Sequence, residues 1–276
     1  MGVVDADVWR QLRGEVQKRK RSHRVGAIAL LGVLLCSCGF LPISRTSRAG
    51  VEVLEKAPKP APVDSEFDGC GPDGSQPDYQ LNRRKNRIDE GKYLPVPWKM
   101  IARLPWPRQV GYRFRNQWGS GEQRQVALYE GTAVQVEGYV AGYRLEVPEP
   151  PNCYAREPEH KDYHIWFSES PDGKRGRSVV VEITPRVRAR HPAWTEDRLA
   201  ALQATQARAR VSGWLLLDQM HSEKVGGNRA TLWEVHPIMR IEWQRRDSTW
   251  VSLDSLSPAP DSALGVSART VRGEPR

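Results

Sequence analysis

Apolar and polar residues alternate in five segments from residue 132 onward, and each segment predicts a β-strand. In the last segment Trp233 and Val235 share one parity while Glu234 takes the other, a period that is typical of a strand with one buried face. The first segment is long, and Gly138 and Gly142 within it permit the bend or bulge that a closing barrel needs. The five predicted strands span residues 132–147, 163–168, 178–185, 211–218 and 230–243.

One helix is predicted between the third and fourth strands. Thr195 can cap its N-terminus, Glu196 and Asp197 suit the positive end of the helix dipole, and Leu199 and Leu202 mark one face. The element order is therefore β-β-β-α-β-β. A mainly β domain whose five strands close into a barrel, with one helix between strands 3 and 4, has the OB-fold arrangement. An open β-sandwich or another small barrel is the alternative.

Composition divides the chain into five parts. The stretch before residue 81 is rich in Pro, Gly, Asp and Ser, which is typical of a linker. The next segment, LNRRKNRID at 81–89, predicts a short helix or an ordered loop. It is followed by PVPWKMIARLPWPRQ at 95–109, and the prolines of this segment exclude a long helix or a central strand. The predicted parts are a signal or anchor (1–44), the linker (45–80), an extended cover segment packed on the domain (81–130), the OB-like barrel (131–250) and a disordered tail (251–276).

Charge is unevenly distributed along the 276 residues. The chain has 42 Lys and Arg against 33 Asp and Glu, a formal net charge of +9, but residues 1–50 alone hold nine of these bases and three of the acids. Composition therefore supplies no basic footprint for nucleic acid on the folded part. Ten Trp residues exclude a wholly disordered chain, and the scarcity of long apolar runs excludes a membrane protein with several spans.

The N-terminus has the pattern of an export signal. The basic sequence KRKRSHR at 18–24 precedes an uncharged run over 25–44 with VGAIALLGVLL at its centre. The run ends in LCSCG, which resembles a bacterial lipobox, so Cys38 is the predicted site of lipidation, although Cys36 is unusual at its position. An uncleaved membrane anchor is the alternative. Either way the basic flank stays in the cytoplasm, and the predicted location is the cell envelope, with the folded domain extracytoplasmic.

Export also affects the cysteines. If Cys36 is removed and Cys38 is acylated, Cys70 and Cys153 remain. A pair of cysteines in an oxidising compartment predicts a disulfide, which would stabilise the fold by about 4 kcal/mol in the chain-entropy model. Two free thiols are the alternative.

Four residues form a candidate metal site. His164 lies on the second strand, Glu182 on the third, and Glu234 and His236 on the fifth, all at polar positions. In an OB barrel these strands are neighbours, so the four side chains can converge on one outer patch. Such a patch could bind a divalent metal and activate water. Ordinary polar residues on the solvent face of a sheet are the alternative. We assign no catalytic residue and no other cofactor, because the sequence has no P-loop, GxSxG or GxGxxG motif.

Nucleic acid is a candidate ligand, because many OB folds bind it. Such binding needs aromatic residues interleaved with Lys and Arg on strands 2 and 3, where Trp166 is the one aromatic of outward parity. Arginines and aromatics do alternate over 103–118, but an extracytoplasmic location disfavours nucleic acid as the ligand.

Several blocks together resemble a family of uncharacterised bacterial exported proteins with an OB-like domain. The similarity spans about residues 68–244, and it implies an exported β-rich domain but no catalytic residue. The blocks are LNRRKNR (81–87), NC…DYHIW (152–166), VVVEITPR (179–186), SGWLLLD (212–218) and WEVHPI (233–238).

These observations predict a membrane-tethered extracytoplasmic module that binds a ligand or has a structural role. Its partner would be a protein, a glycan or another envelope component. We expect the binding surface on a rim formed by loops 148–162, 169–177 and 218–228. A metal-dependent hydrolase that uses the His and Glu patch is the alternative, and a nucleic-acid-binding OB fold is the second alternative.

Overall fold

The computed structural model describes residues 67–75 and 78–256 of the chain. The predicted signal or anchor, the lipidation site Cys38, most of the linker and the tail after residue 256 lie outside the described residues.

Five strands close into a barrel, as the alternation predicts. They run in the order β2-β3-β4-β6-β5, and β5 pairs back with β2. Strands β4 and β6 are parallel and the other barrel pairs are antiparallel. This is the OB arrangement. The barrel strands are β2 (Ala133–Leu145), β3 (Tyr163–Ser168), β4 (Val179–Ile183), β5 (Ala209–Leu217) and β6 (Trp233–Gln244).

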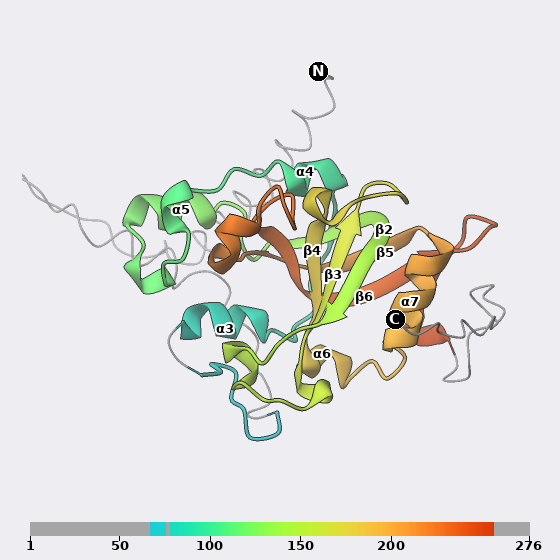
Figure 1. Cartoon of the computed structure of the whole chain (residues 1–276), viewed down its shortest axis with the longest axis horizontal. Helices are drawn as coiled ribbons and strands as arrows, with labels where there is room; N and C mark the ends of the chain where they lie inside the picture. Colours follow the sequence, from blue (N-terminus) through green and yellow to red (C-terminus); the bar gives the residue numbers. More distant parts are fainter. Residues whose placement is uncertain (1–66, 76–77, 257–276) are drawn as a thin grey trace, which may run out of the picture. The chain divides into compact units, whose positions relative to one another are not determined.

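Short elements surround the barrel. Strand β1 (Leu94–Pro95) pairs with β2, and β7 (Trp250–Ser252) pairs with β6. The predicted helix after the third strand is α7, and the shorter α6 precedes it. Figure 1 shows α7 on one side of the barrel and α3 and α5 on the other. The helices are α3 (Tyr79–Lys85), α4 (Trp98–Ala102), α5 (Ser120–Val126), α6 (Pro185–Arg188) and α7 (Glu196–Thr205).

Strand β2 bends where its glycines lie. Its register against β3 shifts between Val140 and Gly142, which is the irregularity that the sequence predicts. Gly138 allows the two strands to approach closely, since a Cβ there would lie 2.4 Å from the carbonyl oxygen of Ser168. The bend lets a strand of this length pair with β3 over one half and β5 over the other.

The apolar core follows the predicted parity. Ile165 of β3 pairs with Val181 of β4, which in turn pairs with Val235 of β6, and all three are buried. Leu199 and Leu202 of α7 are also buried, as expected for the apolar face of that helix.

The cover segment packs on the barrel, but through short helices more than as an extended chain. Trp98 at the start of α4 donates its indole N–H to the carbonyl of Phe167, and Trp214 of β5 donates its own to the carbonyl of Asp89. Ile101 of α4 is buried. Within residues 67–75 and 78–256, no helix has the length and apolar character needed to cross a membrane.

Candidate functional site

The sheet register brings the four predicted site residues together. His164 of β3 lies directly opposite Glu182 of β4. Val180 of β4 pairs with Glu234 in the parallel strand β6, so His236, two residues further along, lies level with Glu182. All four side chains therefore project from the same face of β3, β4 and β6, on the side away from the apolar core.

This face is buried, and the expectation that it faces solvent is wrong. His164, Glu182, Glu234 and His236 are each at most 4% exposed. The covering layer consists of α3 and the loop between β2 and β3, which contact each other through the 3-10 turn η3 (Pro150–Asn152). The sequence predicts a cover segment, but its pattern does not indicate which face of the barrel it occupies.

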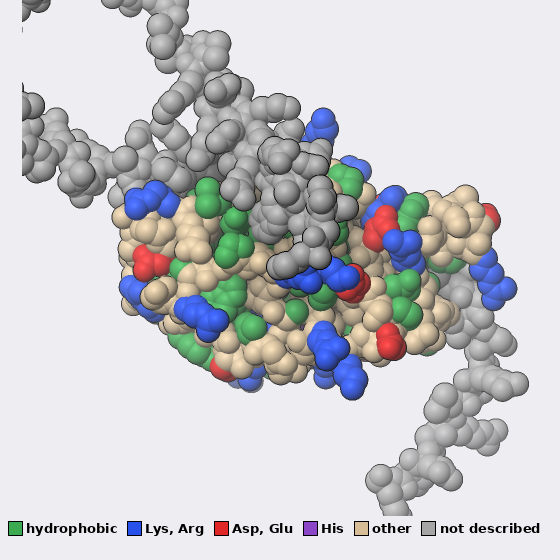
Figure 2. All heavy atoms as spheres, turned by 90° about the horizontal axis from the view of Figure 1, so that it is seen from above, with side chains coloured by type: hydrophobic (Ala, Val, Ile, Leu, Met, Phe, Trp, Pro, Cys, Tyr) green, Lys and Arg blue, Asp and Glu red, His purple; other side chains and the backbone are tan. Residues whose placement is uncertain are grey.

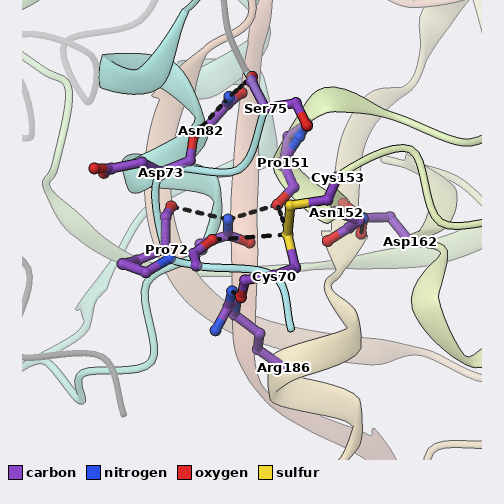
Figure 3. The surroundings of a disulfide bond; sticks show 12 residues. Cys70, Pro72, Asp73, Ser75, Asn82, Pro151, Asn152, Cys153, Asp162 and Arg186 are labelled. Atoms are coloured by element: carbon purple, nitrogen blue, oxygen red, sulfur yellow. Dashed lines mark hydrogen bonds between the residues drawn. A yellow bond between two sulfur atoms is a disulfide. The ribbon is translucent and has the colours of Figure 1, made fainter. Parts of the chain in front are cut away.

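A disulfide fastens this cover. Cys70 and Cys153 are bonded, as predicted, and join the chain before α3 to the loop that precedes β3. Figure 3 shows Pro72 and Pro151 near this bond. Asn86 donates its amide to the carbonyls of both, at 3.0 and 2.8 Å, and so bridges the same two segments. The packed part of the chain thus begins before residue 81, inside the stretch assigned to the linker.

His164 is held between two carboxylates. Its Nδ1 lies 2.8 Å from Glu182 Oε1 and 2.9 Å from Glu146 Oε1. Burial alone would lower the pKa of His164, but the hydrogen bonds with Glu146 and Glu182 outweigh it and raise that pKa to about 9. Alternation in the sequence does not predict Glu146, because it has the numbering parity of the inward residues Val134 and Val140, and the register shift between Val140 and Gly142 brings it to the outer face.

His236 occupies the centre of the cluster. Its Nδ1 lies 3.0 Å from Glu182 Oε2 and 3.4 Å from Glu234 Oε1, and its Nε2 lies 3.5 Å from Asp162 Oδ2. Burial opposes protonation of His236, but the charge of Glu182 outweighs it and raises the pKa to about 10. Burial also raises the pKa of Asp162 to about 6, against the influence of His236.

Three permanent cations border the carboxylates, and Arg144 is one of them, with its Nη2 2.7 Å from Glu146 Oε1. Lys85 at the end of α3 places its Nζ 3.5 Å from Asp218 and 3.8 Å from Glu149. Burial opposes the charge on Lys85, but the two carboxylates hold its pKa above the usual range. Arg229 Nη1 lies 3.3 Å from Glu234 Oε2, so within residues 67–75 and 78–256 Glu234 is the predicted site residue that has a permanent ionic partner.

The face that OB folds commonly use for nucleic acid is closed in this protein. Trp166, the one candidate for stacking on a base, is only 1% exposed, and the guanidinium of Arg175 lies 4.1 Å from its ring centroid. Trp166 also donates its indole N–H to the carbonyl of Asn228. On the surface that Figure 2 shows, Lys and Arg are scattered among other side chains and form no continuous patch. The nucleic-acid alternative therefore loses the stacking platform that it requires.

The predicted binding rim is divided. Loops 169–177 and 218–228 meet, because a Cβ on Gly176 would lie 2.7 Å from the carbonyl oxygen of Gly226. Loop 148–162 joins the other end of β3, so the three loops do not form one rim. Tyr154 in this loop is half-exposed beside the disulfide.

Chemically, the cluster has the donor types that a divalent metal uses. Two sets of three residues each offer ligand atoms within 4.8 Å of one another, and they share Glu182. The sets are Glu146, His164 and Glu182, and Asp162, Glu182 and His236.

Comparison with known proteins identifies no relative: no family model matches the chain, and no curated protein or solved structure matches it.

Proposed function

We propose that this chain is an exported, membrane-tethered module whose OB-like barrel binds a component of the cell envelope. The observation that carries the proposal is the disulfide between Cys70 and Cys153. Disulfides persist in oxidising compartments and are rare in the cytosol. The basic and apolar N-terminal pattern, and the resemblance of five sequence blocks to exported bacterial proteins, support the same location.

The geometry supports binding better than hydrolysis. A hydrolase needs a substrate to reach its metal and its activated water. Here the side chains of Glu146, Asp162, His164, Glu182 and His236 are each at most 6% exposed. A surface hollow of about 190 Å³ lies beside the disulfide, lined in part by Phe67, His160 and Arg186, and none of the five cluster residues lines it.

The test of location uses the full chain expressed in bacteria that process lipoproteins. We expect it in the membrane fraction, labelled by radioactive palmitate, with Cys70 and Cys153 protected from a thiol-alkylating reagent. Cys38→Ala should lose the label, and the neighbouring Cys36→Ala is the matched control that should keep it. Membrane association without label would indicate an uncleaved anchor. A cytoplasmic chain with both thiols free would contradict the proposal.

The test of binding places a photo-crosslinking amino acid at Tyr154, which is half-exposed in the β2–β3 loop. Loops at this position are among those with which OB folds contact ligands. We expect a specific adduct in whole cells, and none with the same amino acid at Arg246, which is exposed beyond the end of β6. Equal labelling at the two positions would count against a binding surface at this loop.

A further inference from the structure

We propose that the buried cluster is a structural zinc site in which Asp162, Glu182 and His236 are the protein ligands. The three come from different places along the chain: the residue just before β3, strand β4 and strand β6. Their ligand atoms lie within 4.8 Å of one another, so side-chain movements of about 1 Å would bring them to the spacing of donors that share one zinc ion.

Several buried atoms that face one another in this cluster have no hydrogen-bond partner among the described residues. These are Asp162 Oδ2, Glu182 Oε2, Glu234 Oε1, and both Nδ1 and Nε2 of His236. They approach to 3.0–3.5 Å, but not in the directions that a hydrogen bond requires. Leaving a buried polar atom unpartnered costs about 1–3 kcal/mol, more for a charged group. A cation bound by one oxygen of Asp162, one oxygen of Glu182 and one nitrogen of His236 would remove that cost for those three atoms.

Neighbouring residues orient the carboxylates of Asp162 and Glu182. Asn152 donates its amide to Oδ1 of Asp162 at 2.7 Å, and the ring of His164 binds Oε1 of Glu182 at 2.8 Å. Each carboxylate thus has one oxygen held by an outer partner, and its other oxygen is directed toward His236. Such outer partners typically fix the ligands of metal sites. Figure 3 shows Asn152 beside Cys153, so the disulfide holds this partner in place.

Charge also favours a bound cation. Among the described residues, six carboxyl groups lie in or beside the cluster, against three permanent cations close to them, namely Lys85, Arg144 and Arg229. A divalent cation would offset part of this excess without requiring His236 to be protonated. The carboxyl groups are those of Glu146, Glu149, Asp162, Glu182, Asp218 and Glu234.

The ligand set favours zinc over the other common divalent ions. Calcium and magnesium prefer oxygen ligands throughout, whereas zinc accepts imidazole nitrogen together with carboxylate oxygen. Burial of all three residues is typical of a structural ion and leaves a substrate no direct approach. The ion would connect β4, β6 and the end of the covering loop.

The experiment uses the full chain, purified without a polyhistidine tag, freed of metal with a chelator and titrated with zinc against a chromophoric competitor. Wild type should bind one zinc ion per chain and gain thermal stability. Asp162→Asn keeps the size and the oxygen facing Asn152, but replaces the ligand oxygen with an amide. We expect zinc binding about 100-fold weaker or worse in this variant. Glu149→Gln, a carboxylate in the same network but outside both sets, is the matched control and should bind like wild type.

A second measurement keeps the proposal testable if Asp162→Asn does not fold. X-ray absorption at the zinc edge of the wild type should show nitrogen and oxygen ligands, with scattering from a single imidazole and no sulfur. The absence of bound zinc, equal affinity in wild type and Asp162→Asn, or a first shell that contains sulfur would each overturn the proposal. In that case a protonated His236 serves as the cation of the cluster.

Discussion

At the residue scale, the unusual feature is the number of ionisable groups in a dry layer outside the apolar core. The parity of single strands was enough to predict that His164, Glu182, Glu234 and His236 share one face. Parity could not show that Lys85 and Glu146 join them, because these residues come from the covering layer and from the end of β2. Their contacts depend on tertiary packing, which leaves no periodic signal in the sequence.

Lys85 should be essential to this layer. Lys85→Met removes the cation between Asp218 and Glu149 and leaves these buried carboxylates without it. The unfolding free energy measured in urea should therefore fall by about 3 kcal/mol or more. Lys99→Met is the control, because Lys99 pairs with Glu169 where both side chains are about half-exposed, and it should cost less than about 1 kcal/mol. Equal costs would show that the buried pair has no special role.

His221 should make stability depend on pH. Its Nδ1 lies 2.9 Å from Asp218 Oδ2, and the negative charge of Asp218 raises the pKa of His221 in the folded state. Protonated His221 therefore stabilises the folded state. This stabilisation is fully present below the pKa of a histidine in the unfolded chain, about 6.5, and is lost as the pH rises through the pKa of His221 in the folded state. The difference in unfolding free energy between wild type and His221→Gln should therefore shrink from pH 6 to pH 9. A difference that stays constant or grows would contradict this linkage.

At the element scale, the five barrel strands and α7 could be predicted from alternation and helix-start signals, because each buries one face along its length. Helices α4 and α5 could not, since five or seven residues give too few turns for a periodic pattern. Strands β1 and β7 are two or three residues long and are defined by their pairing alone. The close contact between β5 and β6 likewise depends on a single glycine.

Gly213 is the residue in β5 that permits this contact. A Cβ there would lie 2.3 Å from the carbonyl oxygen of Pro237 in β6, and this oxygen belongs to the backbone, so it cannot move aside as a flexible side chain could. Gly213→Ala should therefore lower the unfolding free energy by about 1–3 kcal/mol, as overpacking typically does. Gly121→Ala is the control, because a Cβ in α5 would meet no atom within 4 Å, and it should be neutral or stabilising by up to about 1 kcal/mol. Similar losses in both variants would refute the packing argument.

At the scale of the whole molecule, the disulfide joins the two parts of the covering layer. It holds the segment before α3 against the β2–β3 loop, and these two segments together exclude water from the charged face. The number of cysteines and the predicted export were enough to predict the pairing. They could not show that the bond holds together the layer that covers the charged face.

Loss of the bond should be costly. The double variant Cys70→Ser, Cys153→Ser should have an unfolding free energy about 4 kcal/mol lower than wild type, mostly because the unfolded chain gains conformational entropy without the cross-link. Wild type treated with a reductant should fall to the same value, and the double variant should not respond to the reductant. A reductant effect on the double variant would show that another cysteine is responsible.

The most direct test of this account is non-reducing peptide mapping of the full chain recovered from intact cells. If the protein is exported and its covering layer is held by the disulfide, the map should contain a single cross-linked peptide pair, with Cys70 in one peptide and Cys153 in the other. Recovery of both cysteines as free thiols would contradict the oxidising location and the fastened cover together.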